Sequence, residues 1–94
     1  MYKTYARFAL EKTVELLSTD SPTGYTADVA EMIKNEFLAL GCKAYITEKG
    51  GVAAIIGGKN ENDTLLLEAH ADTLGGMVCE IKSTGALRLS PLGG

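Results

Sequence analysis

The sequence predicts an α/β fold in which two helices at the N-terminus are followed by the strands of a partial, mixed sheet. From Thr4 to Leu40, apolar residues recur at spacings of three and four, which is typical of amphipathic helices. After Gly41 the pattern changes to short apolar or alternating runs separated by glycine-rich turns, which is typical of strands. Helices followed by apolar strands indicate a layered packing of helix on sheet.

The first helix is predicted from Thr4 to Ser18. Polar side chains such as Glu11 and Lys12 fall mostly on the opposite side of this helix. The segment Asp20–Gly24 then interrupts the helix, because it combines aspartate, serine, proline and glycine, the residues that form turns. The apolar positions that define the helix are Ala6, Ala9, Leu10, Thr13, Leu16 and Leu17.

A second helix is predicted to begin after Thr26, a residue type that caps helix N-termini. Asp28 lies near the positive end of the helix dipole, where a carboxylate is favourable. Gly41 suits the left-handed conformation that commonly follows a helix. The apolar stripe of this helix consists of Val29, Ile33, Phe37 and Leu40.

Three strands are predicted in the middle of the chain. Residues 42–47 alternate between apolar and polar side chains, as in a half-exposed strand, and Lys49–Gly51 forms a turn. The run Val52–Ile56 is apolar throughout, so both of its faces are expected to be covered. After a polar loop whose Gly57-Gly58-Lys59 start is expected to act as a hairpin turn, Thr64–Ala69 is expected to form a buried strand.

The last part of the chain predicts a hairpin. Met77–Lys82 is expected to be one strand, Ser83–Gly85 the turn, and Ala86–Leu89 the return strand. No further element follows to cover this hairpin, so its edge is expected to be open.

Composition excludes several classes of function. The 94 residues carry a net charge of −3 with no run of Lys and Arg, which argues against nucleic acid as a partner. No apolar stretch is long enough to span a bilayer, and the N-terminus has no apolar signal region, so no membrane contact and a cytoplasmic location are expected. Cys42 and Cys79 show no metal-ligand spacing and are expected to be free thiols on strands.

The candidate functional residues are His70 and Asp72. His70 is the single histidine of the chain and is expected at the end of the third strand, next to the glycine pair Gly75-Gly76. In an extended segment, residues two apart point to the same side, so the Asp72 carboxylate can accept a hydrogen bond from the imidazole. Such a contact fixes the tautomer of a metal-binding histidine.

The same residues have a simpler interpretation. A histidine hydrogen-bonded at a strand end, followed by an aspartate that forms a turn, needs no metal. A metal site normally requires three or four protein ligands. The nearest other carboxylates are Glu68 and Glu80, and Glu68 is expected to be solvated or paired rather than a ligand.

Three segments, in the same order along the chain, resemble metallopeptidase family 42, which includes deblocking, glutamyl and tetrahedral aminopeptidases. The segment Leu65–Val78, with its His-Ala-Asp motif, carries the strongest resemblance, and Gly85–Gly94 resembles the family segment that ends in Pro-Leu-Gly-Gly. The early segment Ser21–Tyr25 resembles the family loop Pro-Ser-Gly-(Tyr/Phe)-Glu.

The resemblance implies a dinuclear aminopeptidase that uses two divalent metal ions, zinc or cobalt, acts on peptide substrates and assembles into homo-oligomers. It implies that His70 is a metal ligand and that Asp72 is the catalytic-site carboxylate that orients it. Residues 1–74 then correspond to the N-terminal part of the catalytic domain, the mixed sheet layer of a di-zinc aminopeptidase. Residues 75–94 correspond to the first hairpin of an inserted β-rich assembly domain.

The chain departs from the family pattern in two respects. Thr73-Leu74-Gly75 stands where many members have Glu-Ile-Gly, and the remaining family ligands and the general base have no counterpart in these 94 residues. We therefore expect an N-terminal fragment that is inactive alone and binds metal weakly at best. The alternatives are a non-catalytic module that associates through its open sheet edge, or a related di-zinc carboxypeptidase or deacylase. An endoglucanase lacks support, because no carboxylate pair flanking a cleft can be placed.

Overall fold

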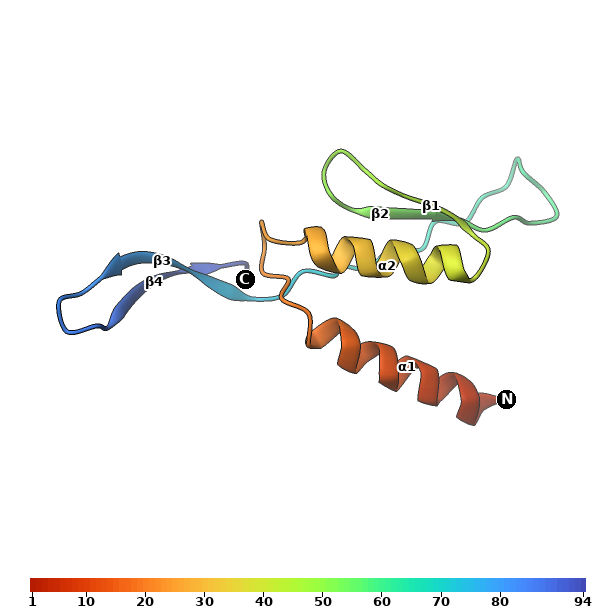
Figure 1. Cartoon of the computed structure of the whole chain (residues 1–94). Coiled ribbons are helices and arrows are strands. Elements are labelled where there is room, and N and C mark those ends of the chain that lie inside the picture. Colours follow the sequence, from red (N-terminus) through yellow and green to blue (C-terminus); the bar gives the residue numbers. More distant parts are fainter.

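Two helices lead into two separate β-hairpins in the computed structural model, which describes residues 1–94 (Figure 1). Each hairpin is an antiparallel pair, and no strand joins one pair to the other. The expected two helices followed by strands are confirmed, but one of the expected strands is missing and a single mixed sheet does not form within these residues. The elements are α1 (Tyr2–Leu17), α2 (Ala27–Ala39), β1 (Lys43–Ile46), β2 (Val52–Ile55), β3 (Gly75–Ile81) and β4 (Leu87–Leu92).

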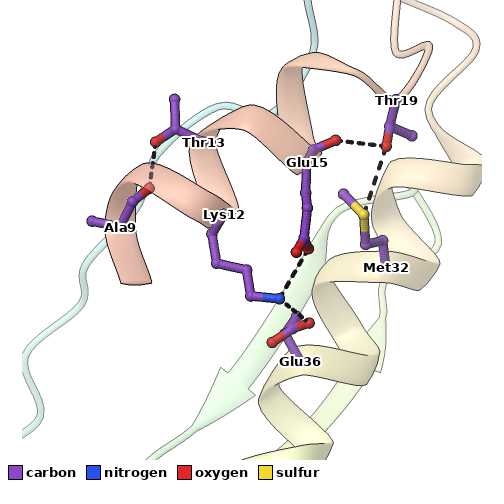
Figure 2. Close-up of polar contacts among 7 residues, drawn as sticks. All are labelled: Ala9, Lys12, Thr13, Glu15, Thr19, Met32 and Glu36. Carbon is purple, nitrogen blue, oxygen red and sulfur yellow. Dashed lines mark hydrogen bonds and ion pairs between the residues drawn. The ribbon is translucent and has the colours of Figure 1, made fainter. Parts of the chain in front are cut away.

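Helix α1 forms where it was predicted, but none of its residues is buried. Its apolar face therefore lacks a partner: Leu10 is 65% exposed and Leu17 is 70% exposed. Figure 2 shows that Thr13 and Thr19 donate hydroxyl hydrogen bonds to the carbonyls of Ala9 and Glu15, four residues earlier.

Polar side chains connect α1 to α2 (Figure 2). Lys12 Nζ lies 2.9 Å from Glu15 on its own helix and 2.7 Å from Glu36 on α2. Near the end of α1, the Thr19 hydroxyl lies 3.6 Å from the sulfur of Met32. Because a hydrogen bond to Glu36, followed by one to Glu15, favours the charged ammonium, the pKa of Lys12 is raised above its ordinary value of 10.5.

Helix α2 begins and ends at the residues that the sequence predicted. Thr26 is its N-cap residue, although the threonine side chain makes no capping hydrogen bond, and Asp28 lies in the first turn. Leu40 closes the helix, and Gly41 follows in the left-handed region with φ +82°. A side chain with a Cβ would be strained at that φ, which explains the glycine.

The small core of the chain lies between α2 and the β1–β2 hairpin. Val29 and Ala30 on α2 are the buried apolar residues, with 1% and 4% exposure. The hairpin pairs Lys43 with Ile55 and continues in register to the pair Ile46 and Val52. In β1 the predicted alternation is confirmed, since Ala44 and Ile46 are half-buried while Lys43 and Tyr45 are exposed.

The segment Thr64–Ala69 does not form the predicted strand. Its backbone is extended but unpaired, and Leu65, Leu66 and Leu67 are 81%, 78% and 85% exposed. The physical reason is that a strand requires a neighbour, and β2 has its only neighbour in β1. The loop from Gly57 to Asp63 is consequently no hairpin turn.

The expectation that both faces of Val52–Ile56 are covered is also wrong. Val52 to Ala54 are half-buried against α2, but Ile55 and Ile56 are 58% and 75% exposed. One face of the two-stranded sheet packs on α2, and the other has no layer of its own chain to pack against.

The β3–β4 hairpin projects away from both helices (Figure 1). Its pairing runs from Gly75 opposite Leu92 to Ile81 opposite Leu87, with a bulge between Val78 and Glu80. All residues of β3 are exposed. The predicted turn is confirmed, because the Gly85 amide donates to the Lys82 carbonyl at 2.9 Å.

Both cysteines are free, as expected. Cys79 lies on β3 and is exposed, whereas Cys42 precedes β1 and is half-buried. No helix of the chain combines the length and the hydropathy required to cross a bilayer.

Very few residues of the chain are buried. Three of its 94 residues are buried, and its radius of gyration is 17.6 Å. A compact domain of this length would have a radius of about 12 Å. The exposed leucines and isoleucines therefore represent apolar surface that the 94 residues cannot cover by themselves.

We predict that the contact between α1 and α2 depends on the charge of Lys12. Because the pKa of Lys12 is raised in the folded chain, its stabilising effect is complete below 10.5 and is lost as the pH rises through the raised value. Lys12→Met should remove the same contact at all pH values. The measurement is the nuclear Overhauser effect between the side chains of Thr19 and Met32.

The matched control is Lys34→Met, because Lys34 pairs with Glu31 within α2 and does not reach α1. Equal intensity of the Thr19–Met32 signal in Lys12→Met and in the unmodified chain would contradict the prediction.

Candidate metal-binding site

A backbone contact joins the loop between α1 and α2 to the segment that precedes β3. The Thr73 amide donates to the Ser21 carbonyl at 2.8 Å, and Pro22 and Thr73 form an isolated parallel bridge. Ser21 is 1% exposed, and its hydroxyl lies 3.4 Å from the Ala71 carbonyl and 3.4 Å from the Thr73 hydroxyl. Two segments about fifty residues apart in sequence are thus held side by side.

Glycine permits the close approach of these segments. A Cβ on Gly75 would lie 2.5 Å from the Cβ of Pro22, which is closer than two carbon atoms can approach. Gly93 adopts a left-handed φ of +77°, and a Cβ there would lie 3.0 Å from the Thr23 hydroxyl. The antiparallel pairing of Gly75 with Leu92 brings Gly93 back to this position.

His70 and Asp72 are in contact, as the sequence predicted. His70 Nδ1 lies 3.1 Å from Asp72 Oδ1 and 3.0 Å from the Asp72 carbonyl oxygen. A carbonyl oxygen only accepts hydrogen bonds, so Nδ1 must carry the proton and donate. In the neutral imidazole, the other ring nitrogen, Nε2, then keeps its lone pair, on a side chain that is 87% exposed.

Thr23 holds the second oxygen of the same carboxylate. Its hydroxyl donates to Asp72 Oδ2 at 2.8 Å. Since hydrogen bonds to a carboxylate favour its charged form, the Thr23 hydroxyl and then the His70 imidazole lower the pKa of Asp72 below its ordinary value. Asp72 is thus an anion at neutral pH, with one oxygen bound to each neighbour.

These side chains line a shallow hollow of about 490 Å³. Its wall also contains Thr73, Leu74 and the terminal pair Gly93-Gly94. A second hollow of about 340 Å³ lies between the start of α2 and β1, but Glu31 is its only charged residue. The hollow beside His70 is therefore the better candidate for a functional site, because it contains both an imidazole and a carboxylate.

The donor set matches part of a metal site. A neutral imidazole whose Nδ1–H donates to a carboxylate and whose Nε2 is free has the form in which histidine binds zinc. No group of three or more His, Cys, Asp or Glu side chains converges in this structure. The 94 residues thus bring together one imidazole and one carboxylate, fewer than the three or four protein ligands of a usual metal site.

The other carboxylates considered from the sequence lie outside this group. Glu80 is on β3, where it pairs with Arg88 at 3.4 Å. Glu68 forms no ion pair or hydrogen bond and is exposed, in agreement with the expectation that it is solvated. His70 itself lies in an unpaired extended segment rather than at a strand end, which corrects the predicted setting but not the predicted contact.

Sequence reasoning missed Thr23 and Gly93. Both come close to Asp72 only through contacts between distant segments, which no local spacing reveals. A signal was nevertheless present, because Thr23 and Gly93 lie within the two outer segments that resemble the family, and these segments meet beside the third.

The structure thus brings a histidine and an aspartate together in the arrangement by which a carboxylate orients an imidazole. Residues 50–94 match the model of the M42 glutamyl aminopeptidase family. The chain belongs to this family, as the resemblance of its three motifs indicated.

Curated relatives agree with this assignment. The chain is 37% identical over 91 residues to a Bacillus subtilis protein named "Putative aminopeptidase YhfE", a match that covers 97% of this chain and 26% of the relative. It is 31% identical over 85 residues to the glutamyl aminopeptidase of Lactococcus lactis, covering 89% of this chain and 24% of the relative. The chain therefore spans about a quarter of the length of these relatives.

We predict that Gly75→Ala separates the two segments of the site. The added methyl group would overlap Pro22, and the resulting strain should destabilise the contact by about 1–3 kcal/mol. The measurement is urea unfolding followed through the chemical shifts of Thr23 and His70. Gly57→Ala is the control, because a Cβ at Gly57 meets nothing within 4 Å. The prediction fails if the two variants unfold at the same urea concentration.

Proposed function

We propose that this chain is the N-terminal part of a dinuclear metallo-aminopeptidase and contributes one metal ligand, His70, to the active site. The observation that carries the proposal is the contact between His70 Nδ1 and Asp72, which leaves Nε2 free for a metal ion. Family membership supports the reaction class, since the matched family is one of aminopeptidases.

In this proposal, Asp72 orients His70 and stays negatively charged, which increases the basicity of the imidazole. His70 would hold one of two divalent ions, zinc or cobalt, and these ions would supply Lewis-acid chemistry for peptide hydrolysis. The general base and the remaining ligands come from residues outside these 94. The substrate is the free N-terminal end of a peptide.

The proposal also assigns the two parts of the chain. Residues 1–74 form the start of the catalytic domain, in which the exposed run Leu65–Leu67 becomes a strand of the completed sheet. Residues 75–94 form the first hairpin of an inserted β-rich domain that supports assembly into a homo-oligomer. The exposed apolar surfaces of both parts support this assignment, because each lacks a covering layer. The free cysteines fit a cytoplasmic location.

A second candidate is a related hydrolase that does not require a free N-terminal amine. It is favoured by one relative, a Pyrococcus abyssi protein named "Putative [LysW]-lysine/[LysW]-ornithine hydrolase", which is 38% identical over 64 residues. That match covers 68% of this chain and 18% of the relative. Comparing a peptide that has a free amine with its N-acetylated form separates the two candidates, because an aminopeptidase cleaves only the former.

We predict that the 94 residues alone do not hydrolyse leucine p-nitroanilide with added Zn²⁺ or Co²⁺, whereas the complete protein that contains them does. In that protein, His70→Ala should abolish the metal-dependent activity, and Asp72→Asn should lower it about 10- to 100-fold, the usual effect of losing a carboxylate that orients a metal ligand. Asp63→Asn, in the loop after β2, is the control and should leave the rate unchanged.

Two outcomes would overturn the proposal. One is turnover by the 94-residue chain that survives repurification and is lost in His70→Ala. The other is full activity of the complete protein after His70→Ala, which would remove the histidine from the site. Hydrolysis of the acetylated peptide alone would favour the second candidate instead.

A further inference from the structure

The carboxylate of Asp72 has a partner beyond His70 that comes from a different part of the chain. Thr23, in the loop between α1 and α2, donates to Asp72 Oδ2 at 2.8 Å, although the two residues are 49 positions apart. Asp72 Oδ1 faces His70 at the same time. The two oxygens of one carboxylate are therefore divided between the threonine and the histidine.

We propose that Thr23 is a positioning residue that fixes the Asp72 carboxylate. The fixed carboxylate then strengthens the preference for the His70 tautomer with a free Nε2, which the Asp72 carbonyl oxygen at 3.0 Å from Nδ1 also favours. The inference deepens the proposed function, because the consequence for metal binding rests on His70 being a ligand. The tautomer itself is a property of this chain that is measurable without any metal.

The need for such a residue follows from exposure. The side chains of His70 and Asp72 are 87% and 41% exposed, so packing restrains Asp72 only in part and His70 hardly at all. Water competes with the imidazole for an exposed carboxylate, and free rotation of the carboxylate would remove Oδ1 from Nδ1. The Thr23 hydroxyl is the one side-chain donor from another segment that restrains this rotation.

Thr23 is exposed, but the chain on either side of it restricts its position. The residue two before it, Ser21, is buried and accepts the Thr73 amide at 2.8 Å. On the other side, Gly93 comes so close that a Cβ there would lie 3.0 Å from the Thr23 hydroxyl. The hydroxyl is thus held between a bridged backbone and the chain segment that follows β4.

The test uses Thr23→Val, which keeps the shape of the side chain and removes the hydroxyl, and Thr23→Ser, which keeps the hydroxyl. Thr84→Val in the β3–β4 turn is the matched control, because Thr84 makes no side-chain hydrogen bond. The readout is the pair of imidazole ¹⁵N shifts, measured in the pH range in which they no longer change with pH. The single histidine of the chain makes the assignment unambiguous.

We expect the Nδ1–H tautomer to predominate in the unmodified chain, in Thr23→Ser and in Thr84→Val. In Thr23→Val, the ratio of the Nδ1–H to the Nε2–H tautomer should fall about threefold, the scale of losing one exposed hydrogen bond. Circular dichroism should show equal helix content in all four proteins. A tautomer ratio in Thr23→Val equal to that of the unmodified chain, or no preference for Nδ1–H in the unmodified chain, overturns the proposal.

A second measurement tests whether the tautomer of His70 affects metal binding. In the complete protein, Zn²⁺ affinity should fall about tenfold in Thr23→Val and recover in Thr23→Ser. A shifted tautomer with unchanged Zn²⁺ affinity would overturn the proposed role of His70 as a ligand, while the positioning by Thr23 would stand. An unshifted tautomer overturns the role of Thr23 and leaves the proposed function untouched.

Discussion

The arrangement of this chain depends on the backbone contact between Ser21 and Thr73. It is the point at which the loop between the helices meets the segment that leads from the β1–β2 hairpin into β3. Ser21 is one of three buried residues, and the other two, Val29 and Ala30, secure only α2 against its hairpin. Without this contact, the β3–β4 hairpin would have no fixed position relative to α2, because it projects away from both helices (Figure 1).

The candidate site extends from that buried contact through Thr23 and Asp72 to the exposed imidazole of His70. The bridged backbone places Thr23, Thr23 restrains the Asp72 carboxylate, and the carboxylate orients an imidazole that is almost fully exposed. Each contact fixes the position of the next side chain but adds little to the free energy of folding, because polar contacts at the surface are weak. The Lys12 contact between α1 and α2 is of the same exposed kind, but it lies outside the site and does not position any of its residues.

The sequence predicted those elements whose pattern is local. Both helices follow from their apolar spacing, Gly41 marks the end of α2, and both hairpins follow from alternation and glycine turns. The prediction failed at Thr64–Ala69, because three consecutive leucines indicate a buried strand, whereas a strand forms only where another strand lies beside it. The backbone there is extended, as the composition favours, and it is unpaired in these 94 residues.

The candidate site likewise has a part that the sequence predicted and a part that it did not. The contact between His70 and Asp72 was predictable, because two residues of an extended segment determine it. The contributions of Thr23 and Gly93 were not, since they depend on how segments from three parts of the chain meet. Family resemblance pointed to those three segments but not to the hydrogen bond that joins two of them, because that bond depends on how the chain folds in space.

The most direct test of this account is the hydrogen-exchange rate of the Thr73 amide in the unmodified chain. Because this amide donates to the carbonyl of a buried residue, it should exchange far more slowly than the unpaired amides of Leu65–Leu67. Protection of Thr73 would establish that the loop and the His70 segment are joined in solution. Exchange of Thr73 as fast as that of the leucine amides would contradict the account, because neither Thr23 nor Asp72 would then have a fixed position.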